Sequence, residues 1–109
     1  MEEALYDTSR LIEAYRKRDA IHGYTTILNL IEFPKAAELD LRILYPSKSD
    51  YNLALKISLE LLKIGKPLPA VDCVIAAVAI NNGLRVITGD SHFEFIKEIR
   101  RDFEVLVEE

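Results

Sequence analysis

The chain has 109 residues, of which half are hydrophobic and 29% are charged, and its net charge is −4. This composition is typical of a soluble globular protein, and we expect residues 1–109 to form a single domain. The negative charge argues against broad electrostatic capture of nucleic acid, and no apolar run is long enough to cross a membrane. The N-terminus is acidic, unlike a signal peptide, and the lone Cys73 has no internal disulfide partner. We therefore expect a cytoplasmic protein.

Short extended segments alternate with helical segments along the whole chain. Alternation of this kind predicts an α/β fold with a parallel sheet and helices on both of its faces. We expect strands at residues 5–6, 23–26, 41–45, 85–88 and 103–107, and helices at about 8–18, 27–31, 35–40, 50–64, 69–80 and 93–99.

The longest predicted helix has clear boundary signals. Ser49 or Asp50 is expected to cap its N-terminus, and Gly65 is expected to end it. Its apolar residues recur at helical spacing, which predicts one buried face made of Leu53, Ile57, Leu61 and Ile64.

Two aspartates stand in apolar surroundings. Asp72 is the only polar side chain in the run from Pro69 to Ile80, and Asp90 follows the apolar pair Val86-Ile87 and then Thr88-Gly89. An isolated buried charge is costly unless it is paired or binds a metal, so residues of this kind are candidates for a functional site.

Four carboxylates are expected at one edge of the predicted sheet. Asp7 and Asp90 each follow a strand, Asp72 lies in the first turn of a helix, and Glu32 ends another helix. The carboxyl ends of parallel strands form the ligand-binding edge of such a sheet. Two unit charges about 5 Å apart repel by roughly 3 kcal/mol at an effective dielectric near 20, so four of them favour a bound cation. Carboxylate oxygens suit Mg²⁺ or Mn²⁺, which support phosphodiester hydrolysis.

Each of these acids also has a purely structural interpretation. Asp7 and Asp90 are possible helix caps, Asp72 interacts favourably with the helix dipole, and Glu32 is a possible solvated residue. The same applies to other polar groups. The histidines His22 and His92 and the buried thiol of Cys73 are more often structural than functional. The basic clusters are interpreted as solvated faces, and they comprise Arg10, Arg16, Lys17 and Arg18, and Arg100 with Arg101.

A set of motifs spans nearly the whole chain in order. They are Tyr6-Asp7-Thr8-Ser9, then Thr26 through Asn29 to Glu32, then Asp72 with Ile75-Ala76-Ala77, then Ile87-Thr88-Gly89-Asp90-Ser91-His92-Phe93. Together they resemble the PIN-domain family, and most of all the small VapC-type toxins of prokaryotic toxin–antitoxin pairs.

The resemblance implies a three-layer α/β/α sandwich with about five mostly parallel strands, and the activity of a Mg²⁺- or Mn²⁺-dependent ribonuclease. It implies a homodimer and an antitoxin partner that blocks the site. It assigns catalysis and metal binding to Asp7, Glu32, Asp72 and Asp90. Thr88, and Thr8 or Ser9, are then supporting residues that hold the carboxylates by hydrogen bonds.

Two features depart from the family pattern. The segment from Glu32 to Leu41 is short where many relatives carry a longer helical segment, and His92 stands where many relatives have another acid. Alternatives to a toxin ribonuclease therefore remain open. One is an RNA-processing PIN nuclease without an antitoxin, and another is a non-catalytic PIN-like interaction scaffold.

Overall fold

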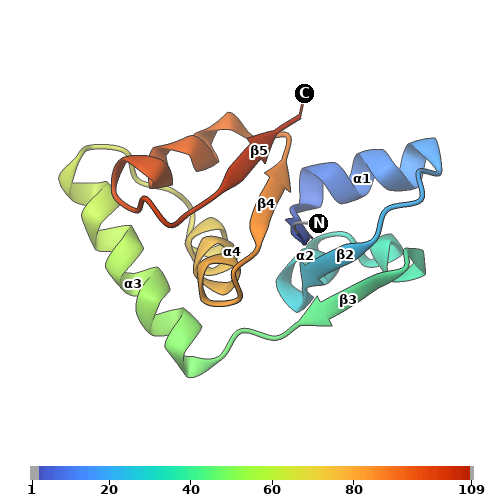
Figure 1. The fold of residues 1–109 in the computed structure, drawn as a ribbon, viewed down its shortest axis with the longest axis horizontal. Helices are drawn as coiled ribbons and strands as arrows, with labels where there is room; N and C mark the ends of the chain where they lie inside the picture. Colours follow the sequence, from blue (N-terminus) through green and yellow to red (C-terminus); the bar gives the residue numbers. More distant parts are fainter. Residues whose placement is uncertain (1–2, 109) are drawn as a thin grey trace.

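A parallel sheet runs through the centre of the molecule (Figure 1). The computed structural model describes residues 3–108, and in this part of the chain all strand pairs are parallel. The strand order is β3-β2-β1-β4-β5, and the strands are β1 (Ala4–Tyr6), β2 (Gly23–Thr26), β3 (Leu41–Leu44), β4 (Arg85–Thr88) and β5 (Val105–Val107). The predicted α/β class and the five parallel strands are confirmed.

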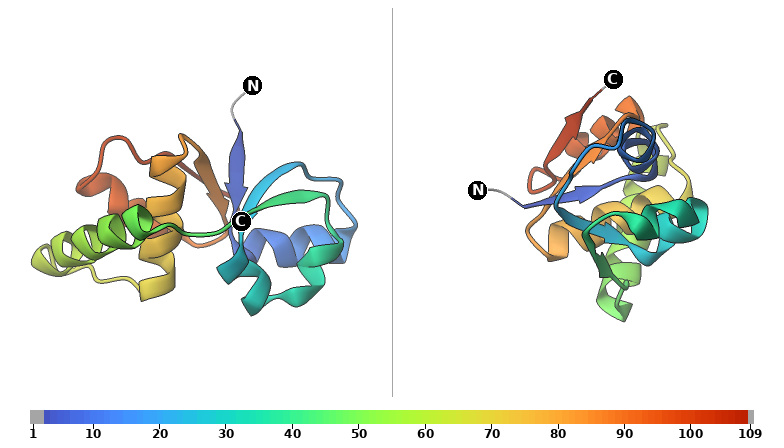
Figure 2. Two further views of the ribbon diagram at one scale, coloured as in Figure 1. Left: turned by 90° about the horizontal axis from the view of Figure 1, so that it is seen from below. Right: turned by 90° about the vertical axis from the view of Figure 1, so that its right-hand side faces the viewer.

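Helices cover the two faces of the sheet in separate groups (Figure 2, left). One group comprises α1 (Thr8–Lys17), α2 (Ile27–Glu32) and the 3₁₀ helix η1 (Pro34–Glu38). The other comprises α3 (Lys48–Lys63), α4 (Ala70–Asn81) and the 3₁₀ helix η2 (Ser91–Glu98). The result is the predicted three-layer α/β/α sandwich.

Several predicted boundaries were wrong, and local hydrogen bonds explain the differences. The predicted helices at 35–40 and 93–99 are 3₁₀ helices that begin slightly earlier. The long helix begins at Lys48, because the Ser47 side chain accepts a hydrogen bond from the Asp50 amide while Asp50 accepts one from the Ser47 amide. Ile64 lies outside the predicted buried face and is 42% exposed.

The core consists of two clusters, one on each face of the sheet. The larger lies between the sheet, α3, α4 and η2, and it includes the fully buried side chains of Leu5, Ile57, Ile75 and Phe93. The smaller lies under α1 and η1 and consists of Leu11, Ala14, Ile21 and Ala36. No helix in the described part of the chain is both long and apolar enough to span a membrane.

The order of the strands creates a switch point at β1. The chain proceeds from β1 outward to β2 and β3, and then crosses to β4 and β5 on the other side of β1. In open α/β sheets, ligands bind at the carboxyl ends of the strands where the order reverses. Here those ends belong to β1 and β4, and the residues that follow them are Asp7 and Gly89-Asp90.

Candidate active site

Asp7 lies at the centre of the switch point and is almost fully buried, with 7% of its surface exposed. The Thr88 hydroxyl donates a hydrogen bond of 2.8 Å to its Oδ2 atom, and the Asn29 amide donates one of 3.2 Å to its Oδ1 atom. Asp7 occupies the N-cap position of α1, yet its side chain makes no capping hydrogen bond. The predicted alternative role as a helix cap therefore does not explain this carboxylate.

Asn29 connects α2 to the first strand, and the sequence analysis did not select it as a site residue. It is fully buried, and its Nδ2 atom donates to both Asp7 and the Thr8 hydroxyl, which lies 2.9 Å away. Its Oδ1 atom accepts hydrogen bonds from the amide and hydroxyl of Thr26. The signal for Asn29 in the sequence is its spacing of three residues from Thr26, which is that of a capping box.

Glu32 reaches the site from the end of α2. Its Oε1 atom accepts a hydrogen bond of 2.7 Å from the Thr8 hydroxyl, across 24 residues of sequence. The Thr8 hydroxyl also accepts from Asn29, so one threonine joins Glu32 to the network that holds Asp7. The structure therefore places Glu32 beside Asp7.

Hydroxyl groups join α1 to the end of β4. The Gly89 amide donates a hydrogen bond of 2.8 Å to the Ser9 hydroxyl, and the Ser9 and Thr88 hydroxyl oxygens are 3.3 Å apart. Because the single hydroxyl proton of Thr88 is donated to Asp7, Ser9 donates its own proton to Thr88. A Cβ atom on Gly89 would lie 3.3 Å from the Ser9 oxygen, so this close approach favours glycine.

Asp72 faces the other three acids from the first turn of α4. Burial raises the pKa of Asp72 to about 6, and the negative charges of Asp7, Asp90 and Glu32 contribute to this shift in that order. His92 is the one neighbour among these causes that opposes it. A carboxyl group that senses three other carboxylates shows that the four acids share one electrostatic environment.

Burial also raises the pKa of Asp7 above its usual value, and the charge of Glu32 acts in the same direction. The hydrogen bonds from the Thr88 hydroxyl, the Thr8 backbone amide and the Asn29 side-chain amide oppose the shift because they stabilise the charged form. The protein thus holds the oxygen atoms of Asp7 in place with neutral hydrogen-bond donors.

Asp90 follows β4 and has a structural role as well. Its Oδ1 atom accepts a hydrogen bond of 2.9 Å from the His92 amide, so it caps η2, as the structural interpretation predicted. The same oxygen lies 2.9 Å from Nδ1 of His92. The amide of Asp90 donates to the Thr88 hydroxyl, which connects Asp90 to Asp7 through a single side chain.

The donor set fits a hard divalent cation in its chemistry. All four groups are carboxylates, and the raised pKa values of Asp7 and Asp72 arise from burial and mutual repulsion that a cation would relieve. Among residues 3–108, however, no three acidic, histidine or cysteine side chains already stand close enough to enclose a metal ion. The four acids therefore lie within electrostatic reach of one another, and they do not form a closed coordination shell among the described residues.

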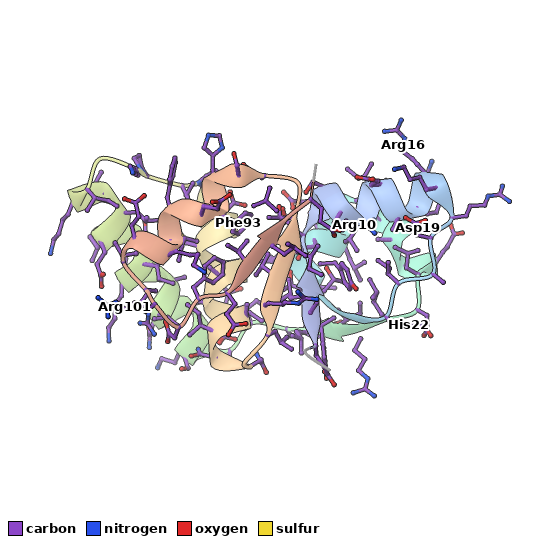
Figure 3. All side chains as sticks on the ribbon, turned by 45° about the horizontal axis from the view of Figure 1, so that its top comes forward. Arg10, Arg16, Asp19, His22, Phe93 and Arg101 are labelled. Atoms are coloured by element: carbon purple, nitrogen blue, oxygen red, sulfur yellow. The ribbon has the colours of Figure 1, made fainter. Side chains whose placement is uncertain are left out.

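Some residues of the predicted basic clusters pair with neighbouring acids. Arg10 pairs with Asp19 and Glu108, and Lys17 pairs with Glu13. Figure 3 shows that Arg16 instead points away from the body of the protein. The interpretation as a solvated face is therefore confirmed for the exposed Arg16, Lys17 and Arg18, and it is wrong for Arg10, whose side chain is only 16% exposed.

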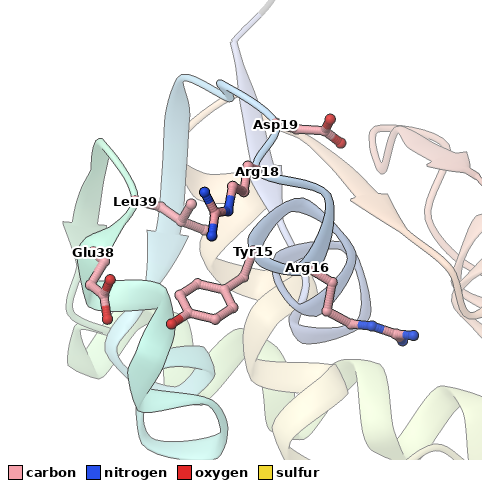
Figure 4. A pocket seen from close by; sticks show the side chains of 6 residues that line it. All are labelled: Tyr15, Arg16, Arg18, Asp19, Glu38 and Leu39. Atoms are coloured by element: carbon pink, nitrogen blue, oxygen red, sulfur yellow. The ribbon is translucent and has the colours of Figure 1, made fainter.

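A cavity of about 540 Å³ lies at the far end of α1. It is lined by Tyr15, Arg16, Arg18, Asp19, Glu38 and Leu39, and Figure 4 shows how these side chains surround it. None of the four acids contributes to it. The candidate active site therefore lies at the sheet edge, and this cavity is not part of it.

Comparison with known proteins agrees with this geometry. A model of the PIN domain matches residues 10–99. The chain belongs to the PIN domain family. The match extends from the third residue of α1 through η2 and therefore includes Glu32, Asp72 and Asp90, while Asp7 lies three residues before it.

Solved structures show that the PIN fold extends over the whole chain. The DNA-bound VapBC of Salmonella typhimurium matches with a TM-score of 0.76 at 21% identity, covering 98% of both chains. VapBC-5 of Mycobacterium tuberculosis, a member of a family of toxin–antitoxin systems, matches with a TM-score of 0.78 at 20% identity, covering 99% of this chain and 100% of that one. VapBC2 of Rickettsia felis, bound to a promoter DNA fragment, matches with a TM-score of 0.78 at 15% identity, covering 95% and 97%. No curated protein sequence matches significantly.

Proposed function

We propose that this PIN domain is a metal-dependent endoribonuclease that hydrolyses RNA phosphodiester bonds. The observation that carries the proposal is the hydrogen-bond network at the switch point, in which Thr88 joins Asp7 to Asp90 and Thr8 joins Glu32 to the same network. The pKa of Asp72 is raised by its burial and then by the charges of Asp7, Asp90 and Glu32, which agrees with this arrangement. Four carboxylates that repel one another at the switch point of a parallel sheet are suited to holding a cation against a phosphate.

Within this proposal, Asp7, Glu32, Asp72 and Asp90 hold Mg²⁺ or Mn²⁺. A bound ion of this kind lowers the pKa of a coordinated water and stabilises negative charge on the phosphate and on the leaving oxygen. The supporting residues Thr8, Ser9 and Thr88 orient the acids through the hydrogen bonds described above. Asn29 joins this supporting set, because it donates to both Asp7 and Thr8.

We also propose that the chain is the toxin of a toxin–antitoxin pair, acts in the cytoplasm as a homodimer, and consists of one domain over residues 1–109. Support for the antitoxin partner comes from the matched structures, which are of VapBC toxin–antitoxin proteins. The test is whether the product of an adjacent reading frame binds the purified chain and prevents RNA cleavage. A nuclease that no neighbouring product inhibits would instead fit an RNA-processing role.

RNA cleavage with and without metal tests the catalytic proposal. Purified protein is expected to cleave single-stranded or loop RNA in Mg²⁺ or Mn²⁺, and a chelator is expected to stop it. Asp72→Asn is expected to be inactive while remaining folded by circular dichroism, because it removes a carboxylate without changing the side chain's shape. Asn52→Ala, on the exposed face of α3, is the control that should retain full activity. A broad RNA panel left intact by metal-bound wild-type protein would favour the interaction scaffold.

A further inference from the structure

His92 stands beside the four acids, and the core does not use its side chain. It is the second residue of η2 and follows Asp90 at the carboxyl end of β4. It is also among the groups whose charge acts on the pKa of Asp72, which places its ring within electrostatic reach of α4. Its side chain is 65% exposed. A ligand at the candidate active site would therefore meet this ring.

Two contacts fix the orientation of the exposed ring. The Nδ1 atom of His92 lies 2.9 Å from Oδ1 of Asp90, and the same oxygen accepts a hydrogen bond of 2.9 Å from the His92 backbone amide. The ring centre lies 5.5 Å from that of Phe95, with the two planes tilted by 54°. One nitrogen and one side of the ring are thus held, although most of the side chain faces solvent.

The contact with Asp90 decides what the other ring nitrogen offers to a ligand. An ionised carboxylate only accepts hydrogen bonds, so the hydrogen between the two side chains belongs to Nδ1 of His92. In the neutral imidazole, Nε2 then carries a free lone pair and is an acceptor. Within residues 3–108 no side chain or backbone amide donates to Nε2. The site therefore presents a fixed hydrogen-bond acceptor to solvent beside its carboxylates.

This acceptor matches a ribose better than a phosphate. Phosphate oxygens accept hydrogen bonds and have no proton to offer to a lone pair, whereas the 2′-hydroxyl of ribose both donates and accepts. An imidazole ring is smaller than one nucleotide. Because Nδ1 contacts Asp90, Nε2 lies within one nucleotide of a phosphate held beside that carboxylate. The ribose next to such a phosphate is thus within reach of Nε2.

We propose that His92 selects RNA over DNA, with its Nε2 atom accepting a hydrogen bond from a ribose 2′-hydroxyl of the bound strand. The inference rests on the proposed function, in which the four acids and a metal ion act on a phosphate. That phosphate is the same in RNA and in DNA, so the acids alone do not distinguish the two. The 2′-hydroxyl is the group by which a protein distinguishes them at a given position.

The test compares binding of three single strands that have the same base sequence. They are RNA, DNA and RNA with 2′-fluorine in place of the hydroxyl, and fluorescence anisotropy is recorded in a chelator so that no strand is cleaved. The wild type is expected to bind RNA about threefold to tenfold more tightly than DNA, the effect of one net hydrogen bond. The 2′-fluoro strand keeps the sugar shape of RNA but has no hydroxyl proton, so it should bind as DNA does.

His92→Asn separates the proposed contact from the one with Asp90. The asparagine amide can take the place of Nδ1 and donate to Asp90, while nothing reaches the position of Nε2. The variant is expected to bind RNA as weakly as DNA, with wild-type affinity for DNA and a wild-type Mg²⁺ shift in melting temperature. His22→Asn is the matched control. Its Nδ1 atom also lies near a carboxylate, 3.5 Å from Asp40, but His22 precedes β2 at the opposite edge of the sheet. This control should keep the preference for RNA.

Several results would overturn the assignment of His92. They are a wild type that shows no preference for RNA, including one that binds neither strand, and a preference that persists in His92→Asn. An equal loss of affinity for RNA and DNA would indicate a phosphate contact instead, and loss of the Mg²⁺ shift would indicate a role in orienting Asp90.

The inference and the catalytic proposal fail in different ways. Binding in a chelator requires no catalysis, so a protein that selects RNA through His92 but cleaves nothing in Mg²⁺ would contradict the catalytic proposal alone. A metal-dependent ribonuclease whose preference for RNA is unchanged in His92→Asn would contradict the role of His92 alone.

Discussion

At the scale of single residues, the candidate site depends on hydrogen bonds between distant parts of the sequence. Thr88 and Asn29 hold the two oxygens of Asp7 from opposite sides, and they come from β4 and α2. Apolar surroundings in the sequence point to Asp72 and Asp90, and positions at the ends of predicted elements point to Asp7 and Glu32. The sequence analysis did not select Asn29, because an asparagine three residues after a threonine has an ordinary role as a helix cap.

Asn29→Ala should destabilise the protein by about 1–3 kcal/mol, because the buried Oδ1 atom of Asp7 and the buried hydroxyl proton of Thr26 lose their partner. Urea unfolding measures the change. Asn52→Ala is the matched control, since Asn52 is exposed on α3 and its replacement favours the helix. Equal stability of the two variants would show that the Asn29 network contributes little to folding.

The pKa of Asp72 predicts a dependence of stability on pH in the absence of metal. The folded protein raises this pKa from 3.8 to about 6, so the unfolded chain ionises more readily. The contribution of Asp72 to stability is therefore fully present below about pH 4 and is lost as the pH rises through about 6. With a chelator present, the melting temperature of the wild type should fall relative to that of Asp72→Asn across this range.

Asp102→Asn is the control for this titration. The hydrogen bond from Arg100 lowers the pKa of Asp102, so its charged form favours the folded state and its effect has the opposite sign. A melting difference between the wild type and Asp72→Asn that stays constant from pH 4 to 7 would contradict the raised pKa.

At the scale of elements, the order of helices and strands was predicted correctly from the sequence, but the ends of several helices were not. Periodicity identifies where a helix runs, but a boundary depends on which polar side chain makes the capping bond. For α3 the cap is Ser47, with Asp50 completing the box, although Ser49 and Asp50 were the expected caps. Ile64 was expected on the buried face, but α3 ends at Lys63 and Ile64 lies beyond it, 42% exposed.

Asp50 also joins α3 to α4. We therefore expect replacement of Asp50 to destabilise the protein more than replacement of the cap residue Ser47. Its Oδ2 atom accepts from the Ser47 amide, and its Oδ1 atom accepts a hydrogen bond of 2.7 Å from Asn81 at the end of α4. Ser47→Ala should cost about 1 kcal/mol through the lost cap. Asp50→Ala should cost more in a denaturant titration, because it removes the bond from Asn81 in addition to the one from the Ser47 amide.

The exposed Ser49 provides the control for α3, and Ser49→Ala should change stability by less than about 0.5 kcal/mol. If Asp50→Ala were no more destabilising than Ser47→Ala, the bond between Asp50 and Asn81 would not hold α3 against α4.

At the scale of the whole molecule, the parallel sheet explains why acids far apart in sequence share one site. Strand alternation predicted the sheet, and the sheet places the ends of β1 and β4 side by side. The exposed apolar side chains of α3, among them Leu55, Leu59 and Leu62, were not predicted, although the buried face of this helix was predicted correctly except for Ile64. The distances among the four carboxylates also depend on tertiary packing that the sequence pattern does not specify.

The central claim is that the four carboxylates share one metal site, and the shift in melting temperature on adding Mg²⁺ tests it most directly. At a hundredfold excess over the dissociation constant, Mg²⁺ should stabilise the wild type by about 2.7 kcal/mol. Asp90→Asn should gain less, because a ligand is lost while the asparagine oxygen still accepts from the His92 amide. Without metal, Asp90→Asn should melt at or above the wild-type temperature, since one repelling charge is gone. Equal Mg²⁺ shifts in the two proteins would contradict the shared site and leave Asp90 as a helix cap.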